Sequence, residues 1–281
     1  MIEFLRLGIP VTWLSRGGYF FGRLESTRHV NVFRQEQQVL LKGSFFYLNL
    51  AKKVIVAKAH NQMTLLRRYN RTAALPEVCA AIDEILVLHR HIFRCSTNER
   101  IMGYEGAIAK IYFRALGMLV PEEFAFTGRS KRPPLDAFNA MLSFGYTLLM
   151  YDIYTVLHNE GLHPYFGFLH ALKKGHPALA SDLMEEWRAV LVDSMVLSLV
   201  HHHEIKPEHF KRAMDDAAGG IFLTREGRAI FLRAYEKKMK TVNKYVEGKH
   251  SYRRTLSYQA RQYAQALMAQ NEEMYDPIAL R

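Results

Sequence analysis

The chain has 281 residues, of which 49% are hydrophobic and 23% are charged, so it can form one large domain or a small domain and a larger one. Its formal net charge of +11 indicates a polyanionic partner, nucleic acid before an acidic membrane surface. Cys79 and Cys95 are its only cysteines, which excludes a disulfide framework and a cysteine-rich zinc site and fits a reducing cytoplasm.

The sequence predicts neither a targeting segment nor a membrane span. The N-terminal stretch MIEFLRLGIPVTWLS contains Glu3 and Pro10, and no signal-peptide cleavage pattern follows it. The most apolar run, residues 137–157, is interrupted by Asn139, Ser143 and Asp152, whereas a membrane span needs about 20 nearly unbroken apolar residues. We expect a buried helix there and no membrane association.

Residues 9–25, IPVTWLSRGGYFFGRLE, carry the β signal of the chain. Two aromatic and β-branched runs flank Arg16-Gly17-Gly18, which is typical of a hairpin turn. A lone hairpin is marginal in water, so it must pack on the helices, on a partner or on further strands. We predict a small β element over residues 1–28.

From about Val32 the sequence predicts helices. Gly43 is a weak point in the first long segment, Pro76 starts a second helix after a linker at residues 70–74, and residues 96–99 (STNE) form a capping box that opens a third. Helical spacing in the first segment is kept by Leu41, Phe45, Leu48, Ile55, Ala59, Met63 and Leu66.

The second half of the chain continues in the same way. Residues 128–134, GRSKRPP, predict a basic loop, and a long helix should run from about Asp136 to Gly161. Further helices are expected after Pro177, Pro207, Thr224 and Ser251. The predicted fold class is mainly α, with a large helical domain at residues 29–281.

The two last helices lie in a basic stretch, residues 236–265, where Lys and Arg are interleaved with Tyr. Such a run is usually a solvated helix face. Its acids are only Glu236 and Glu247, and this imbalance favours contact with phosphates.

Glu105 lies in the middle of a predicted core-facing stripe. At about 100° per residue, Arg100, Lys110 and Arg114 lie opposite Glu105. Six apolar positions fall within about 60° of it: Ile101, Ile108, Ala109, Tyr112, Leu116 and Leu119. A buried carboxylate must be neutralised, paired or coordinated, so the pattern allows either an ion pair with an arginine or a metal ligand. Gly103 and Gly106 would let another backbone approach closely.

Residues 161–188 bring His170, Asp182 and Glu185 close together in sequence. We expect two helical pieces joined by the turn at residues 174–177, with both acids on one helix face. Glu186 and Asp193 extend this acidic stripe on an otherwise apolar helix. A divalent cation would suit these oxygen ligands and one imidazole nitrogen, although pairing with basic side chains is the alternative.

Four motifs resemble one known family. YEGAIAKIYF, RPPLDAFNAMLSFGYTLL, GLHPYFGFLH and ALASDLMEEWR occur in this order, and the chain ends in YDPIALR. Together they resemble the CRISPR-associated endonuclease that acts as the spacer-acquisition integrase ("Cas one"). The resemblance runs from about Ile9 to the C-terminus. It implies a prokaryotic cytoplasmic, metal-dependent DNA endonuclease and integrase.

The resemblance also implies a site and partners. Glu105, His170 and Glu185 match the metal ligands, with Mn²⁺ or Mg²⁺ as the cofactor and Asp182 as an assisting acid. The partners would be double-stranded DNA (spacer precursor and CRISPR repeat), a second copy of the chain, and a small CRISPR-associated protein ("Cas two") in a heterohexamer. The expected phosphate contacts are Arg129, Lys131, Arg132, Lys173, Lys174, Lys237, Lys238, Arg253 and Arg254.

The chain departs from the family pattern at two places. His163 stands where an Asp is expected in the turn, and family members begin with several more strands ahead of the hairpin at Ile9. The hairpin would then be the remnant of a shortened β-domain. Two alternatives to an active integrase follow, namely a non-catalytic basic DNA-binding subunit and a truncated family member unable to assemble.

Overall fold

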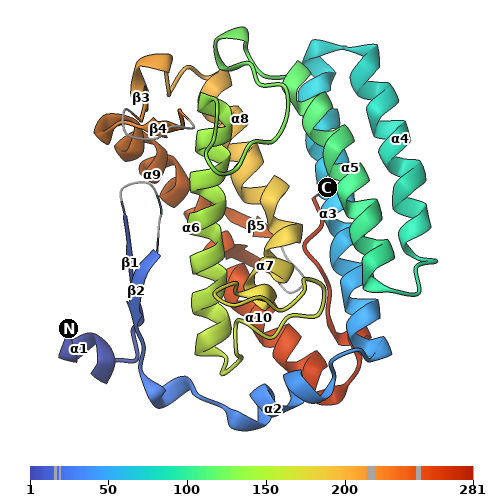
Figure 1. The fold of residues 1–281 in the computed structure, drawn as a ribbon, viewed down its shortest axis with the longest axis vertical. Helices are drawn as coiled ribbons and strands as arrows, with labels where there is room; N and C mark the ends of the chain where they lie inside the picture. Colours follow the sequence, from blue (N-terminus) through green and yellow to red (C-terminus); the bar gives the residue numbers. More distant parts are fainter. Residues whose placement is uncertain (16–17, 19, 214–218, 245–247, 281) are drawn as a thin grey trace. The chain divides into compact units, whose positions relative to one another are not determined.

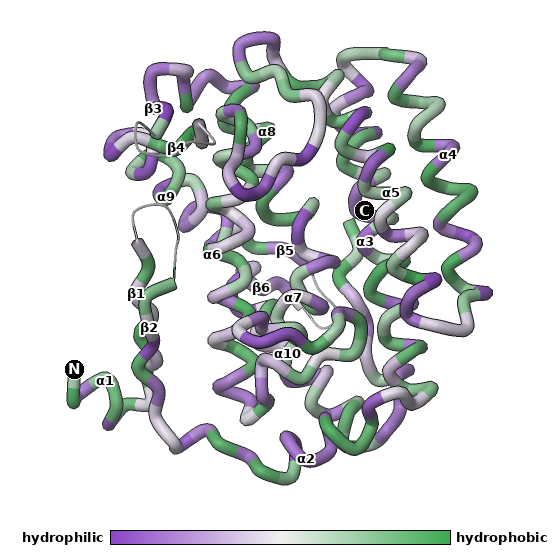
Figure 2. Tube along the Cα trace, in the orientation of Figure 1, coloured by the Kyte–Doolittle hydropathy of each residue, from purple (hydrophilic) through white to green (hydrophobic). Residues whose placement is uncertain are grey.

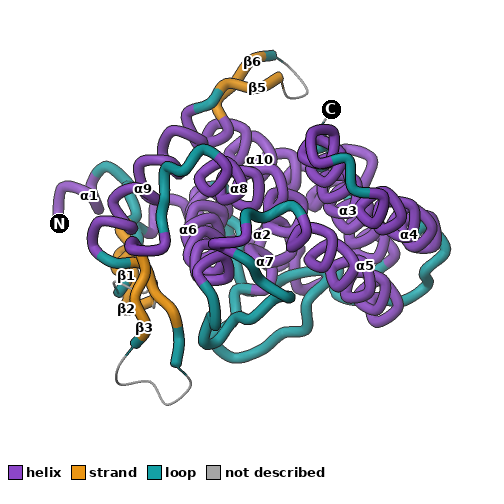
Figure 3. The backbone as a smooth tube through the Cα atoms, turned by 90° about the horizontal axis from the view of Figure 1, so that it is seen from above, coloured by secondary structure: helices purple, strands orange, loops and turns teal. Residues whose placement is uncertain are grey.

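The computed structural model describes residues 1–281 except 16–17, 19, 214–218, 245–247 and 281. Helices make up most of the described chain, and strands occur as short antiparallel pairs (Figures 1 and 3). The predicted mainly-α fold class is therefore confirmed. The α-helices are α1 Ile2–Arg6, α2 Val32–Leu40, α3 Phe45–Ala73, α4 Pro76–Ile92, α5 Asn98–Met118, α6 Ala137–Asn159, α7 Ala178–Met184, α8 Ser194–His201, α9 Arg225–Lys240 and α10 Tyr252–Ala269.

The predicted hairpin is present as β1 (Val11–Leu14) and β2 (Phe20–Leu24). The two strands pair antiparallel, with Val11 opposite Leu24 and Trp13 opposite Gly22. Most of the predicted turn, Arg16 and Gly17, lies outside the described residues. Two further hairpins were not predicted: β3 Phe210–Arg212 with β4 Ile221–Leu223, and β5 Val242–Lys244 with β6 Lys249–Ser251.

The chain divides into two compact units, each built from separate stretches of sequence. Unit 1 contains residues 1–54, 147–185 and 242–277, and unit 2 contains residues 55–146, 186–241 and 278–281. The predicted boundary after residue 28, between the small β element and the helical domain, was drawn from the sequence pattern and stays a prediction.

The core of unit 1 is aromatic. Tyr47, Phe168, Tyr263 and Tyr275 are buried and lie ring against ring, and α2 packs on α10. The buried side chain of Gln38 donates to the carbonyl oxygens of His163 and Phe166 (3.1 Å each) and accepts from the His163 amide (2.8 Å). These bonds tie the loop after α6 to α2.

In unit 2, α4 and α5 lie side by side (Figures 1 and 3). Hydrophobic and hydrophilic segments alternate along α4 (Figure 2), as in an amphipathic helix. Its apolar side is buried through Val78, Ile82 and Ile85. Pro76 occupies the first turn of α4, as predicted, and Thr97 caps α5 by accepting from the Arg100 amide.

Several predicted boundaries were wrong in detail. Helix α3 continues through the predicted linker to Ala73, and the cap of α5 is Thr97 instead of Ser96. Pro207 begins a single 3-10 turn, Pro207–His209, which leads directly into β3. Residues 161–177 contain no helix in the described chain, so only the second of the two predicted helical pieces exists.

The long apolar run forms α6, as predicted. By length and composition alone this helix could cross a membrane, but 44% of its apolar window is buried in the protein. Near its start, buried Asn139 is bonded to the carbonyl of Gly128 (2.8 Å) and the amide of Ser130 (3.2 Å). A polar side chain satisfied in this way belongs to a protein core.

Candidate functional site

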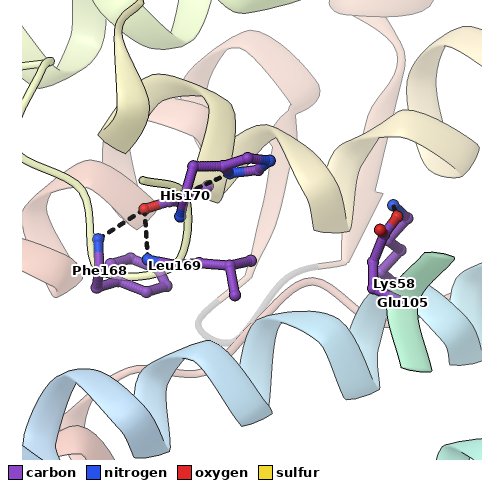
Figure 4. Close-up of polar contacts among 6 residues, drawn as sticks. Lys58, Glu105, Phe168, Leu169 and His170 are labelled. Atoms are coloured by element: carbon purple, nitrogen blue, oxygen red, sulfur yellow. Dashed lines mark hydrogen bonds and ion pairs between the residues drawn. The ribbon is translucent and has the colours of Figure 1, made fainter. Parts of the chain in front are cut away.

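In unit 1, the carboxylate of Asp182 organises the loop that carries His170. Asp182 is fully buried on α7. It accepts from the backbone amides of Phe168 (2.7 Å), Leu169 (3.0 Å) and His170 (3.0 Å), and its Oδ1 lies 2.6 Å from His170 Nδ1. Figure 4 shows Phe168, Leu169 and His170 side by side, with dashed lines that mark these bonds. The loop is thus held by the same acid that orients its histidine.

Local sequence explains this close approach. Gly167 leaves room for the carboxylate, since a Cβ there would lie 2.3 Å from Asp182 Oδ2 and 2.8 Å from the Ala178 backbone. Pro177 precedes the first residue of α7, and the Leu179 amide donates to the Pro164 carbonyl (2.9 Å). The start of α7 is therefore fixed to the loop.

Glu185 lies directly after α7, three residues beyond Asp182. Its backbone stays in the right-handed helical region, and the residue is 5% exposed. The chain then changes from α-helix through a 3-10 turn at Glu185–Trp187 to a π-helical segment at Arg188–Asp193. π-Helical turns inside helices often mark functional sites.

The predicted acidic stripe does not act as one cluster. In unit 2, Glu186 accepts from the Ile278 amide (2.8 Å). Asp193 accepts from the hydroxyls of Tyr112 (2.7 Å) and Tyr146 (2.5 Å), and burial raises the pKa of its carboxyl. Each of these acids is bonded to a different part of the protein, so the excess of charge inferred for the stripe is not evidence for a metal.

Glu105 belongs to unit 2, where its carboxylate meets the ammonium of Lys58 from α3 (Figure 4). The stripe around Glu105 is buried through Ile101, Ile108 and Tyr112, as predicted. The expected arginine partner is instead a lysine. Gly103 and Gly106 have open space where a side chain would lie, so the predicted close backbone approach was wrong.

Lys58 was not predicted as a site residue. The sequence nevertheless contains a signal for it. Lys58 lies within an apolar helical pattern that includes Val54, Ile55 and Leu65, which are all buried. A lone cation in such a pattern predicts a buried acidic partner. The sequence of α3 contains no Asp or Glu, so the partner had to come from another element.

The basic residues differ in accessibility. Arg129 donates to Asn139 Oδ1 (2.5 Å) and to the Ser143 hydroxyl (3.2 Å) and lies over the Tyr146 ring, and burial lowers the pKa of its guanidinium. It supports the loop and is only partly exposed, and its role as a phosphate contact stays a prediction. Burial, helped by Arg68, lowers the pKa of Lys238 to about 8. The exposed positions are Lys131, Arg132, Lys173, Lys174, Lys237, Arg253 and Arg254.

Neither unit, in the part of the chain that the structure describes, gathers three or more His, Cys, Asp or Glu side chains in a metal-binding arrangement by itself. Of the predicted site residues, the structure brings His170 and Asp182 into contact within unit 1, and Glu185 belongs to the same unit. Glu105 is held separately in unit 2.

A family model described as "CRISPR associated protein Cas1" matches residues 1–237. The CRISPR-associated endonuclease Cas1 of Mycobacterium tuberculosis (strain CDC 1551 / Oshkosh) is 36% identical over 259 residues, which cover 92% of this chain and 75% of that protein.

Two solved structures share the fold. A chain of a Cas6-RT-Cas1–Cas2 complex superposes with a TM-score of 0.85 at 25% identity, over all of this chain and 31% of its own length. A casposase bound to integration product gives a TM-score of 0.82 at 22% identity, over 96% of this chain and 74% of its own.

Proposed function

The chain belongs to the CRISPR-associated Cas1 family, and on that premise we propose that it is a metal-dependent DNA endonuclease and integrase that inserts spacer DNA into a CRISPR array. Glu105, His170 and Glu185 would hold Mn²⁺ or Mg²⁺. The observation that carries the proposal is the Asp182–His170 contact at 2.6 Å, because a carboxylate on the second ring nitrogen is how metal-binding histidines are oriented.

The residues fit a divalent cation by their chemistry. Two carboxylates and one imidazole form a mixed oxygen and nitrogen donor set of the kind that Mn²⁺ accepts. Glu185 is 5% exposed, and Glu105 already neutralises a cation, the Lys58 ammonium. A bound cation is one of the ways in which buried acids of this kind are compensated.

Asp182 would fix the protonation of His170. With Nδ1–H donating to the carboxylate, Nε2 is the ring nitrogen that carries a lone pair, as a metal ligand must. The backbone amides of Phe168, Leu169 and His170 hold the same carboxylate in place, so the imidazole plane is set before a ligand arrives.

The reaction would be phosphoryl transfer. A bound Mn²⁺ or Mg²⁺ polarises a phosphate and stabilises its developing negative charge, a contribution of several kcal/mol. The nucleophile is the 3′-hydroxyl of an incoming DNA fragment during integration, or water during cleavage. Exposed Lys173 and Lys174 beside the His170 loop would contact the DNA backbone, with Arg253 and Arg254 on α10.

The proposed partners are double-stranded DNA, a second copy of the chain and a small Cas2 protein, in a prokaryotic cytoplasm. One of the solved structures that share the fold is a complex of Cas1 with Cas2, which supports a Cas2 partner. We further propose a homodimer within a heterohexamer, which size measurement with and without Cas2 would test. That measurement would also identify a family member that folds but does not assemble.

The first prediction is that Glu105→Ala abolishes Mn²⁺-dependent integration into a supercoiled target, by at least about 100-fold, because a ligand to the catalytic cation is lost. The assay compares reactions with and without Mn²⁺ and with and without Cas2. Glu84→Ala is the matched control, since Glu84 is an exposed acid paired with Arg114 at 3.2 Å. Undiminished integration by Glu105→Ala would refute the site.

The second candidate is a non-catalytic basic DNA-binding subunit. The Lys58–Glu105 pair favours it, because an acid used in a structural ion pair needs no metal. This candidate requires that the protein take up no Mn²⁺ and that its DNA affinity be the same with and without a chelator.

A further inference from the structure

The ammonium of Lys58 is bonded to the Glu105 carboxylate in the interior of unit 2. The Lys58 side chain is 8% exposed and that of Glu105 is 18% exposed. Two charges so far removed from water stabilise each other, because neither is well hydrated.

Several neighbours of Lys58 on its own helix, α3, are apolar. Val54, Ile55, Ala59 and Leu65 on the same helix are buried and apolar. An alkyl side chain would fill this space without the desolvation cost of an ammonium. The placement therefore favours charge compensation of Glu105 over packing.

We propose that Lys58 is the resident counter-ion of Glu105, which a divalent cation must displace, so that Lys58 sets how tightly the cation binds. The inference rests on the proposed function, in which Glu105 is a metal ligand. Before the cation binds, the ammonium neutralises the buried carboxylate. When a divalent cation is bound, Glu105 would act as its ligand and the Lys58 ammonium would move away from the carboxylate.

This arrangement has a definite thermodynamic consequence. Part of the attraction between the cation and Glu105 is offset by the loss of the Lys58–Glu105 pair and by repulsion from the displaced ammonium. A neutral side chain at residue 58 removes both terms. The affinity for the cation must then rise. If Lys58 instead supported the cation site, the same substitution would lower the affinity.

The second prediction is that Lys58→Gln binds Mn²⁺ about tenfold or more tightly than the unaltered protein, measured by titration calorimetry on the full chain without DNA. Glutamine removes the charge but can still donate a hydrogen bond to Glu105. Lys58→Met, which lacks that bond, should show the same direction, and Lys58→Arg should stay near the unaltered affinity.

Lys53→Gln is the matched control. Lys53 lies on the same helix, and its ammonium is 3.0 Å from Glu273 in unit 1, so losing its charge should leave Mn²⁺ affinity unchanged. Adding Glu105→Gln to Lys58→Gln should cancel the gain, which assigns the effect to this pair. The Mn²⁺-induced rise in melting temperature gives a second reading for any variant that is less stable.

The outcomes separate this inference from the proposed function. Equal or weaker Mn²⁺ binding by Lys58→Gln and Lys58→Met overturns the counter-ion role, while integration lost in Glu105→Ala still supports the proposed function. Mn²⁺ binding that emerges only when Lys58 is neutral supports the counter-ion role but contradicts a working metal site in the natural chain. Absence of binding in every variant overturns both.

Discussion

Asp182 in unit 1 and Glu105 in unit 2 are both buried acids, but their charges are satisfied in different ways. Asp182 is fully buried and accepts from three backbone amides and an imidazole. The Glu105 carboxylate is met by the ammonium of a lysine side chain.

The difference bears on what each acid can do. Backbone amides cannot leave a carboxylate unless the loop is rebuilt, so Asp182 is suited to holding His170 in position. A lysine side chain has rotatable bonds and can withdraw, so Glu105 can exchange its partner for another cation. This contrast agrees with the roles proposed above, in which Asp182 positions His170 and Glu105 is a ligand.

Asp182→Ala, our third prediction, removes the acid that the backbone amides hold. It leaves three backbone amides without this acceptor, two of them buried, and removes the support of His170. We therefore expect a loss of about 3–5 kcal/mol in the free energy of unfolding. Urea unfolding followed by circular dichroism measures it.

Asp152→Ala is the control for Asp182→Ala. Asp152 pairs at 3.3 Å with Arg253, which is 46% exposed, and such a surface pair contributes about 0–1 kcal/mol. If the two substitutions cost the same, Asp182 is not the acid that organises the loop.

Much of the fold could be predicted from periodicity and caps. The segments opened by Pro76, Pro177, Thr224 and Ser251 are helices, and Gly43, with its positive φ of 78°, separates α2 from α3. The short hairpins β3–β4 and β5–β6 were missed because three-residue strands are too short to show alternation.

The candidate site was only partly predictable. The stripe around Glu105 predicted a buried carboxylate, and the Glu105 side chain is 18% exposed, since helical periodicity reports burial. Its partner could not be identified, because Lys58 lies 47 residues away on another helix. The non-helical loop of His170 could not be predicted either, since its conformation depends on Asp182, a long-range contact that local propensity does not contain.

The fourth prediction tests how closely the loop must approach Asp182. In Gly167→Ala the new methyl group would meet both the Asp182 carboxylate and the Ala178 backbone, so we expect a loss of about 1–3 kcal/mol in unfolding free energy and weaker Mn²⁺ binding through a displaced His170. Thermal unfolding and calorimetry measure the two effects.

Gly103→Ala is the matched control for Gly167→Ala. Its Cβ would meet open space in the interior of α5, so alanine should raise stability by about 1 kcal/mol. A neutral effect of Gly167→Ala would show that the carboxylate does not need the space left by glycine.

The fifth prediction, with the smallest effect, concerns a third acid, Glu25, whose partners are basic side chains. In unit 1, Glu25 contacts Arg23 Nε (2.5 Å) and His158 Nε2 (3.3 Å). Burial lowers the pKa of His158, while Glu25 raises it and Arg23, His29 and His163 lower it further.

Because the folded state disfavours protonated His158, its contribution to stability is complete above the ordinary histidine pKa near 6.5 and is lost as pH falls through the lower folded value. His158→Gln should therefore lose less stability than the unaltered protein between about pH 7 and pH 5. Urea unfolding at each pH measures this slope, and His203→Gln, at a 72% exposed histidine, should leave it unchanged. If the slope of unfolding free energy against pH is unaltered in His158→Gln, Glu25 holds the imidazolium as readily as water does. The charged partner of Glu25 in unit 1 is then no more exchangeable than the amides around Asp182.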